Sequence, residues 1–528
     1  MPILEVSQPG CDNPLKIPAL AGQRFSEAIW LSGQIAPAPL CAGLALCGRC
    51  KIRFADSPPP PTEEDTRYFS PAELLAGWRL ACHHLVPDFE LIRLELPIQS
   101  HEIASSRNTI AVIGYKGAAY LGVDFGTTAI EWRAITPEGC AVAEGKCVNP
   151  QAGAGADVIA RLAFAMQESG KHSLSEIGLK AIADIIASMD QPDFRLERIC
   201  IAANTAMTQI LLARDIAGLC AAPYRQEWHG GESIDIKYPG FSELIETVFP
   251  PLPAPFVGGD ISAGLLALIA DNIERPFLLA DLGTNAELAL LNKENSLYLV
   301  SAPLGPAMEG VGPRCGHPAG KGVITSFSAA PSGLATTFFE ATQDTGFDEC
   351  RGIGATGYIS LVSLLLRLNI LDQTGHYNAS CGLPIAQKIL SNLKNDILHL
   401  PFGQVLEKAD LEILLKAKAA FASALRLLLK TAGMEANELK VFALAGALGK
   451  HANPEDLAML GFIPYSLVDR LLAVGNSSLE GACMLAREPQ KNEELKLLCS
   501  RAHVIQPALD KEYNADYIDQ MDWRPYDR

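Results

Sequence analysis

The stretch "YLGVDFGTTAIEW", residues 120 to 132, is an apolar strand that ends in an acidic, glycine-rich turn and continues as a second strand. The stretch "FLLADLGTNAELAL", residues 277 to 290, repeats this form about 157 residues later, as two homologous half-domains would. Each turn offers backbone N–H groups and a hydroxyl to a phosphate, while Asp124 and Asp281 can hold a water-ligated Mg²⁺. One such turn alone is commonly structural, but two in this context predict a phosphate site.

The chain around both stretches has the pattern of an α/β protein. From Ala118 onward, short apolar runs that end in glycine-rich turns alternate with long amphipathic segments. The clearest predicted helix, "DLEILLKAKAAFASALRLLLK" at residues 410 to 430, has apolar residues at positions 411, 414, 415, 421, 425, 428 and 429. This spacing predicts a helix that faces a core.

Composition and charge exclude several classes of protein. The chain has 528 residues, 48% of them apolar, which is enough for a multidomain protein with ordinary cores. Its formal net charge of −17 offers no basic surface to a phosphate backbone, so no nucleic acid partner is expected. The N-terminus lacks the pattern of a signal peptide, and the most apolar stretch, residues 358 to 371, is interrupted by Arg367. We therefore expect a cytoplasmic protein with no membrane partner.

Four cysteines have the spacing of a metal centre. The stretch "CAGLALCGRCKIRF", residues 41 to 54, contains Cys41, Cys47 and Cys50, and Cys82 follows in "GWRLACHH". Zinc usually takes two C-x2-C pairs, and Cys82 has no such partner. Plant-type [2Fe–2S] proteins have C-x4-C-x2-C and a remote cysteine, and this chain has one extra residue in the first gap. The pattern favours a [2Fe–2S] cluster, with zinc or buried thiols as the alternatives.

The surroundings of the cysteines agree with this prediction. Small residues at positions 42, 43, 45 and 48 suit a loop whose backbone amides approach cluster sulfurs. His83 and His84 follow Cys82 directly, but four cysteines already complete the ligand shell, so we expect solvated or supporting histidines. After residue 97 the polar, unpatterned stretch "IQSHEIASSRNT" predicts a linker.

The paired turns resemble those of the ATPase superfamily that includes acetate and sugar kinases, Hsp70 and actin. "DFGTT" is similar to the first phosphate loop of that superfamily and "DLGTN" to the second. Residues 256–269 and 352–366 resemble its connecting helices, and residues 442–464 resemble its adenosine segment. The resemblance implies nucleotide-site residues, which are Asp124, Gly126, Thr127, Thr128, Asp281, Gly283, Thr284, Asn285, Gly446 and Gly449. Asp124 and Asp281 would be the catalytic carboxylates.

The cysteine motif combined with this ATPase resembles the reductive activators of corrinoid proteins. Four further phrases are similar to that family: "NPQAGAGADVIARL" (149–162), "AANTAM" (202–207), "PAMEGVGPRCGHPAGKGVI" (306–324) and "VGNSSLEGA" (474–482). Some members of the family have a separate middle domain. Here the first phosphate strand begins about 20 residues after the ferredoxin-like region, so we expect no such domain.

The resemblance implies a fold and a domain order. An N-terminal β-grasp ferredoxin-like α+β domain would precede an α/β two-lobed, actin-like ATPase core with RNase H-like halves. The expected limits are 1–97 for the [2Fe–2S] domain, 98–117 for the linker, 118–276 and 277–490 for the two ATPase halves, and 491–528 for a C-terminal extension.

The resemblance also implies an activity: delivery of one electron from the cluster, coupled to Mg²⁺ and ATP, to convert Co(II) to Co(I) in a corrinoid protein. Cys41, Cys47, Cys50 and Cys82 would hold the cluster, and an unidentified donor would reduce it. A homodimer is compatible with the family. The catalytic base is not assigned; Glu309 is a candidate for a nucleotide or magnesium contact, and Cys315 is expected to be a buried thiol.

Three other functions fit parts of the pattern. An activator of radical dehydratases is also an ATPase coupled to electron transfer, but its [4Fe–4S] cluster is shared at a dimer interface, and residues 118–490 have no suitably spaced cysteine pair. A small-molecule kinase fused to a ferredoxin would have no use for the cluster. An ATP-gated binding protein with a sensing cluster would bind a partner without turnover.

Overall fold

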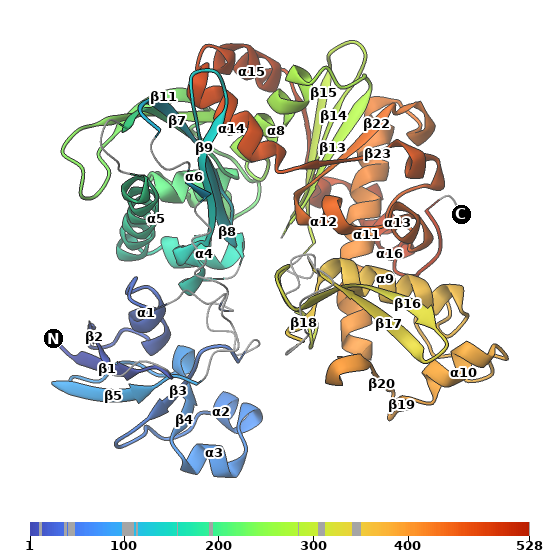
Figure 1. Ribbon diagram of the computed structural model, residues 1–528, viewed down its shortest axis with the longest axis horizontal. Coiled ribbons are helices and arrows are strands. Elements are labelled where there is room, and N and C mark those ends of the chain that lie inside the picture. Colours follow the sequence, from blue (N-terminus) through green and yellow to red (C-terminus); the bar gives the residue numbers. More distant parts are fainter. Residues whose placement is uncertain are drawn as a thin grey trace. The chain divides into compact units, whose positions relative to one another are not determined.

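The computed structural model describes residues 1–9, 13–35, 40, 48–97, 110–111, 115–155, 157–189, 194–283, 285–304, 312–339 and 350–526. The chain forms two compact units, residues 1–260 with 482–492 and residues 261–481 with 493–528. Cys41, Cys47, Thr284 and Glu309 lie outside the described residues. Figure 1 colours the chain from the blue N-terminal sheet to the red C-terminal helices.

The N-terminal sheet of the first unit is a β-grasp. Its strands are β1 (Ile3–Ser7), β2 (Leu15–Pro18), β3 (Lys51–Phe54), β4 (Trp78–Leu80) and β5 (Leu91–Glu95), in the order β2-β1-β5-β3-β4. The central pair β1 and β5 is parallel, and the other pairs are antiparallel. Alternate residues such as Leu4, Val6 and Leu94 are buried against α1 (Phe25–Trp30), because side chains of period two share a face. This confirms the predicted ferredoxin-like fold. The helices α2 (Glu63–Tyr68) and α3 (Pro71–Leu75) connect β3 to β4.

A second sheet follows in the same unit. Its order is β11-β12-β10-β7-β8-β9-β6, built from β6 (Ile110–Ala111), β7 (Gly117–Phe125), β8 (Ala129–Ile135), β9 (Ala141–Val148), β10 (Phe194–Ala202), β11 (Gly230–Ile236) and β12 (Ile245–Pro251). Strands β7, β8 and β9 form an antiparallel meander, and β10 and then β12 join β7 in parallel. The connections contain η2 (Pro150–Gly153), α4 (Val158–Ala165), α5 (Glu168–Ser188), α6 (Thr205–Leu211) and α7 (Ala217–Cys220).

The second unit contains a sheet with the same topology. Its order is β23-β22-β13-β14-β15-β24, from β13 (Phe277–Leu282), β14 (Asn285–Leu291), β15 (Leu297–Pro303), β22 (Val441–Ala445), β23 (Leu471–Gly475) and β24 (His503–Ile505). Strands β13, β14 and β15 form the meander, and β22 and then β23 join β13 in parallel. The two "D-x-G-T" stretches therefore occupy the first hairpin of two equivalent sheets, which confirms the prediction of repeated RNase H-like halves.

Helices and small sheets complete the second unit. The long helix α11 (Lys408–Ala432) confirms the predicted core-facing helix, since all seven of its predicted apolar positions are buried. Helix α16 (Lys511–Asp519) contacts α11, and the unit also contains α10 (Pro384–Leu390), α12 (Gly446–His451), α13 (Pro454–Met459) and most of α15 (Lys491–Ser500). Two three-stranded sheets are formed by β16 (Val323–Ala330), β17 (Gly333–Phe338) and β18 (Gly352–Ile353), and by β19 (Leu393–Lys394), β20 (Ile397–His399) and β21 (Val405–Leu406).

The predicted connecting helices are partly wrong. Helix α8 (Gly259–Ala270) contains one boundary between the units, as expected. Helix α9 (Ala355–Arg367) lies wholly within the second unit, where its apolar residues join the core. Boundaries also lie within α14 (Ser477–Arg487) and within α15. An amphipathic pattern predicts that one face of a helix is buried, but it does not predict which part of the protein covers that face. The sequence pattern of α9 is therefore the same as that of a helix that connects two units.

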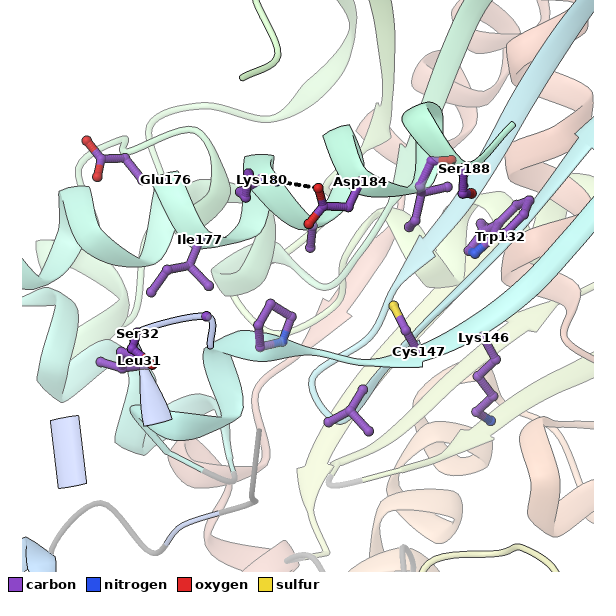
Figure 2. Close-up of a pocket in the computed structure, with 15 residues that line it drawn as sticks. Leu31, Ser32, Trp132, Lys146, Cys147, Glu176, Ile177, Lys180, Asp184 and Ser188 are labelled. Atoms are coloured by element: carbon purple, nitrogen blue, oxygen red, sulfur yellow. Dashed lines mark hydrogen bonds and ion pairs between the residues drawn. The ribbon is translucent and has the colours of Figure 1, made fainter. Parts of the chain in front are cut away.

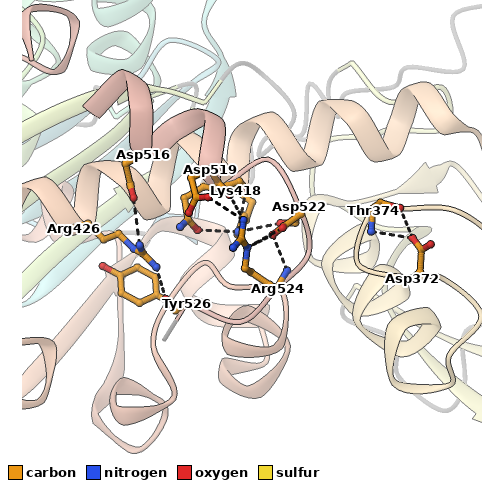
Figure 3. Close-up of polar contacts among 10 residues, drawn as sticks. Asp372, Thr374, Lys418, Arg426, Asp516, Asp519, Asp522, Arg524 and Tyr526 are labelled. Atoms are coloured by element: carbon orange, nitrogen blue, oxygen red, sulfur yellow. Dashed lines mark hydrogen bonds and ion pairs between the residues drawn. The ribbon is translucent and has the colours of Figure 1, made fainter. Parts of the chain in front are cut away.

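The C-terminal residues pack on α11 through a buried lysine. Lys418 is 0% exposed, and its Nζ donates to the Gln520 and Asp522 carbonyls, both at 3.1 Å, and to Oε1 of Gln520 at 3.0 Å. Figure 3 shows this network beside Arg426, which stacks on Tyr526. The same residues bury Trp523 in the core. None of the described helices is long and apolar enough to cross a membrane.

Candidate cluster and nucleotide sites

Two of the predicted cluster ligands, Cys50 and Cys82, meet at one edge of the β-grasp. Cys50 directly precedes β3, and Cys82 lies in η1 (Ala81–His83), directly after β4. The Ala81 amide donates to the Cys50 carbonyl at 2.8 Å, which aligns the two strand ends. The two sulfur atoms are 3.3 Å apart and both residues are buried. This distance is too long for a disulfide bond and suits neighbouring ligands of one metal centre.

A buried carboxylate supports the Cys82 turn. Both oxygens of Asp65 accept hydrogen bonds, one from the Leu80 amide at 2.8 Å and the other from Nε2 of His84 at 2.7 Å. Burial raises the pKa of Asp65, but the hydrogen bonds from His84 and from backbone amides outweigh it and hold the pKa at about 2. His84 therefore binds Asp65 and supports the Cys82 turn. Of the two roles expected for this histidine, solvated or supporting, the structure shows the supporting one.

The cysteine pair opens onto a cavity of about 390 Å³. Its walls come from the β-grasp and from α4, among them Arg24, Leu40, Ala160 and Phe164. Two buried soft sulfur ligands beside such a space fit an iron–sulfur cluster. Within the described residues no group of three or more metal-ligating side chains converges, so a four-thiolate shell needs Cys41 and Cys47, as the spacing predicts. The cluster type stays a prediction.

The first phosphate turn joins β7 to β8. Asp124 lies near the end of β7, and Gly126, Thr127 and Thr128 form the turn. A Cβ at Gly126 would be 2.8 Å from the Ala129 carbonyl oxygen, so this tight turn requires glycine. The four predicted residues therefore lie together at the carboxyl end of β7.

Three side chains that the sequence analysis did not assign hold this turn. Asn149 donates from Nδ2 to the Gly126 carbonyl at 2.8 Å and from its backbone amide to the Thr128 carbonyl at 2.9 Å. Arg161, 0% exposed, donates to the Thr127 carbonyl. Asn204 donates to Oγ1 of Thr127 at 3.3 Å and caps α6 through the Met207 amide at 2.9 Å. All three residues lie in the stretches 149–162 and 202–207, whose resemblance to the family was the one sequence feature that could have identified them.

The second turn joins β13 to β14, with Asp281 in β13 and Asn285 as the first residue of β14. The Gly283 amide donates to the Asn285 carbonyl at 3.0 Å, which closes the hairpin. Gly446 follows the parallel strand β22 with φ +75°, and a Cβ there would lie 3.6 Å from Oδ1 of Asp281. The structure therefore brings Gly446 from the predicted adenosine segment to the predicted carboxylate.

Each predicted carboxylate has an acidic cross-strand neighbour. Asp124 is opposite Glu131, and Asp281 is opposite Glu287, which is 7% exposed. Residues directly opposite in an antiparallel pair share a face of the sheet. Carboxylate oxygens are the ligands that Mg²⁺ prefers, so each hairpin, taken by itself, offers donors of the type that a water-ligated Mg²⁺ takes.

Two other predicted residues have structural explanations. A Cβ at Gly449 would be 2.2 Å from the Leu444 carbonyl oxygen, so glycine is needed there for close helix packing whether or not a nucleotide binds. Cys315 is half-buried, its sulfur accepts from the Val405 amide at 3.4 Å, and burial raises its pKa. A raised pKa disfavours the reactive thiolate, in agreement with the expected buried thiol.

A larger cavity of about 540 Å³ lies elsewhere in the first unit. Figure 2 shows Glu176, Lys180 and Asp184 of α5 on one wall and Trp132 and Cys147 of strands β8 and β9 on another. Its lining contains none of the predicted cluster or nucleotide residues. This larger cavity therefore does not coincide with the predicted sites.

Two relatives of known name are similar over most of this chain. The corrinoid activation enzyme RamQ of Eubacterium limosum is 25% identical over 385 residues, which are 69% of this chain and 63% of RamQ, so the match spans less than two thirds of that relative. The [Co(II) methylated amine-specific corrinoid protein] reductase of Methanosarcina barkeri is 24% identical over 401 residues, 70% of each chain. The solved structure "Reductive activator for corrinoid,iron-sulfur protein" has the same fold, with a TM-score of 0.66, 19% identity and 99% coverage of both chains.

Two family models match consecutive parts of the chain. Residues 120–272 match the RACo middle region, and residues 275–527 match the C-terminal domain of RACo, the ASKHA domain. The segment expected to form the first ATPase half is the one that matches the RACo middle region. Because the two adjoining matches together cover more than half of the sequence, this chain belongs to the RACo family.

Proposed function

We propose that this protein is an ATP-dependent reductive activator that delivers one electron to a corrinoid protein and converts its Co(II) to Co(I). The observation that carries the proposal is the combination, in one chain of the RACo family, of a β-grasp with a buried cysteine pair and two hairpins of the phosphate-turn type. The names of the two relatives support a corrinoid protein as partner.

The proposed roles follow from the geometry. Cys50 and Cys82, with Cys41 and Cys47, would hold a [2Fe–2S] cluster, which supplies a one-electron carrier when bound. Gly126, Thr127 and Thr128 would donate to phosphate oxygens from a turn whose carbonyls are already occupied by other residues. In the second hairpin Thr284 and Asn285 would donate to phosphate oxygens, and Gly283 would shape the turn, since its own amide donates to the Asn285 carbonyl. Asp124 and Asp281 would orient the water shell of Mg²⁺.

Coupling to ATP would overcome an unfavourable electron transfer. A plant-type cluster has a potential near about −400 mV, and a protein-bound Co(II) corrinoid is expected to be harder to reduce than this donor allows. A nucleotide-driven difference of about 5.5 kcal/mol between two conformations shifts an equilibrium about 10⁴-fold, which corresponds to roughly 240 mV for one electron. ATP binding and hydrolysis can therefore supply the missing driving force. An unidentified electron donor would reduce the cluster again, and a homodimer remains compatible with the proposal.

The test is an anaerobic assay of corrinoid absorption with the cognate partner, a reductant and Mg·ATP. The wild-type protein should convert Co(II) to Co(I) only with ATP. Asp281→Ala should retain the cluster absorption and its chemical reduction but lose the ATP-dependent conversion, because it removes a carboxylate of the nucleotide site. Cys50→Ser should retain nucleotide binding and lose electron delivery. Equal rates and extents without ATP would contradict the coupling and leave a plain electron carrier.

A further inference from the structure

One segment of the first unit contacts both the phosphate turn and the cysteine domain. It comprises residues 149–155 and 157–165, that is η2 and α4, and is called the bridging segment here. It includes most of the phrase "NPQAGAGADVIARL", for which the cluster and the nucleotide site provide no direct role. Its contacts on the two sides are made by different residues.

On one side, the bridging segment occupies every carbonyl of the phosphate turn. Asn149 holds the Gly126 and Thr128 carbonyls, and Arg161 holds the Thr127 carbonyl. Both residues are 0% exposed. Arg161 also donates from Nε to the Gly155 carbonyl at 3.0 Å, which ties the turn to the loop between η2 and α4. A shift of the turn on phosphate binding must therefore move the bridging segment or break buried hydrogen bonds, which is costly.

On the other side, the same segment packs against the β-grasp. The Leu40 amide donates to the Ala152 carbonyl at 3.4 Å. A Cβ at Gly153 would be 2.8 Å from the Trp30 carbonyl oxygen and 2.9 Å from Cδ2 of Leu31, so only glycine allows this approach. Contacts this close leave little freedom for independent movement.

Helix α4 divides these two roles between its faces. Leu162 and Ala165 are buried against α5, α6 and α7, and Arg161 is buried at the phosphate turn. Ala160, Ala163 and Phe164 are spaced by three and four residues, and they line the cavity onto which Cys50 and Cys82 open. One short helix therefore carries the residue that holds the Thr127 carbonyl and forms a wall of the cysteine cavity.

We propose that the bridging segment transmits the state of the phosphate turn to the cluster, with Arg161 and Gly153 as positioning residues at its two ends. This inference rests on the proposed function and names its regulation. Nucleotide binding at the turn would draw α4 and η2 towards the β-grasp and exclude water from the cavity. A drier cavity disfavours the extra negative charge of a reduced cluster, so the midpoint potential should fall and the bound electron should become more reducing.

The test measures the cluster potential in the full-length, reconstituted protein, with and without a non-hydrolysable ATP analogue and Mg²⁺. At a fixed applied potential, the analogue should lower the ratio of reduced to oxidised cluster about tenfold, which is a shift of about 59 mV. Hydrogen exchange of residues 158–165 should slow at the same time. This second readout does not depend on activity.

Two variants separate the two sides of the bridge. Gly153→Val should keep the iron content and the analogue affinity, measured by calorimetry, but lose most of the potential shift, because it pushes the bridging segment from Trp30. Arg161→Lys keeps the charge and loses the forked contacts, so it should also lose the shift. Gly382→Val is the matched control, since no atom lies within 4 Å of a Cβ there, and it should shift as the wild type does.

The outcomes distinguish this inference from the proposed function. If the wild-type protein binds both analogue and cluster but its potential and exchange do not change, or if Gly153→Val retains the full shift, the bridge is wrong while the proposed function stands. If the folded protein binds no analogue or assembles no iron–sulfur cluster, the proposed function fails, and the inference fails with it.

Discussion

At the residue scale, the buried carboxylate of Asp65 helps to determine the geometry of the cysteine site, although Asp65 is not part of the cysteine motif. It is 0% exposed and accepts from the backbone amides of Thr62 and Leu80 and from His84. The Leu80 amide lies two residues before Cys82, so the carboxylate fixes the strand end that positions this sulfur. A buried carboxylate with several donors is stable only while all of them are in place.

Asp65→Asn should therefore destabilise the β-grasp. The amide cannot accept at both oxygen positions, so at least one buried donor loses its partner, at a cost of about 1–3 kcal/mol. We expect a lower midpoint of chemical denaturation and a faster loss of iron from the reconstituted protein. The control is Glu64→Gln, because Glu64 is the adjacent, more exposed carboxylate, 3.5 Å from Nδ1 of His83. Equal effects of both substitutions would contradict the argument.

Asn204→Ala should weaken nucleotide binding. The substitution removes the bond to Oγ1 of Thr127 and the cap of α6, which together position the hydroxyl of the first phosphate turn. A loss of about 1 kcal/mol corresponds to an affinity roughly five- to tenfold lower. Calorimetry with an ATP analogue measures it. Ser70→Ala removes a comparable cap, from α3 in the β-grasp, and should leave the affinity unchanged.

The sequence predicted the residues that carry chemistry better than the residues that position them. Cys50 with Cys82 and Asp281 with Gly446 come together as expected. Asn149 and Arg161 were not predicted, because their role arises from contacts to carbonyls more than 20 residues away. A motif identifies a functional group by its type and spacing. A side chain that only donates to a distant backbone carbonyl does not occur at a fixed spacing from the residues of the motif.

At the scale of elements, α8 and α14 cross at a glycine contact. A Cβ at Gly481 would be 1.9 Å from the Ala263 carbonyl oxygen, and one at Gly264 would be 2.8 Å from Oγ of Ser477. The backbones of the two helices therefore touch at a point where no other residue fits. Both helices also contain a boundary between the two units.

Gly481→Ala should destabilise the protein, although this exchange usually stabilises a helix by about 1 kcal/mol. The added methyl group collides with backbone, which cannot rotate away as a side chain can. A fall in the midpoint of chemical denaturation is the expected result. Gly382→Ala, at a position with nothing within 4 Å, serves as the control. An increase in stability for Gly481→Ala would show that the two helices have room to separate.

Lys418 makes the docking of the C-terminal residues on α11 depend on pH. Burial lowers its pKa to about 8, from an ordinary value of 10.5. Between these values the unfolded chain binds more protons than the folded one, so the free energy of unfolding gains a contribution that rises with pH. Relative to Lys418→Met, the wild type should therefore become more stable by roughly 1–3 kcal/mol between pH 8 and pH 10. Urea denaturation at both pH values measures this.

The control for this prediction lies on the same helix. Lys416 is exposed on α11, so Lys416→Met should show the same pH dependence as the wild type. If the difference between wild type and Lys418→Met stays constant from pH 8 to pH 10, the lysine is not the group that titrates.

Among the elements, α11 was predicted correctly because its apolar residues recur with the helical period over 21 residues. The role of α9 was not, since a buried helix face has the same pattern whichever elements cover it. The local sequence determines which face of a helix is buried. Which helix or strand packs on that face depends on contacts between distant parts of the chain.

At the scale of the whole molecule, the repeated topology has a physical basis in the two hairpins. Each half begins with a strand, a tight acidic turn and an antiparallel strand, and each then adds parallel strands beside the first one. This arrangement brings the carboxyl end of a parallel strand next to the turn, as with Ala445 beside Asp281. The repeat was visible in the sequence. The limits at residues 97, 117, 276 and 490 stay predictions.

The cluster and the nucleotide site should have to belong to one chain for the protein to be active. The bridging segment connects the phosphate turn to the cysteine cavity within a single polypeptide, so an intact nucleotide site on one molecule should not activate the cluster of another. Cys50→Ser lacks the cluster and Asp281→Ala lacks the nucleotide carboxylate. An equimolar mixture of the two, incubated to allow exchange of subunits, should therefore reduce Co(II) no faster than either variant alone. Recovery to a substantial fraction of the wild-type rate would mean that the electron passes to, or the nucleotide acts on, a second copy of the chain. It would then make a homodimer the functional unit, and coupling within one chain would no longer account for the activity.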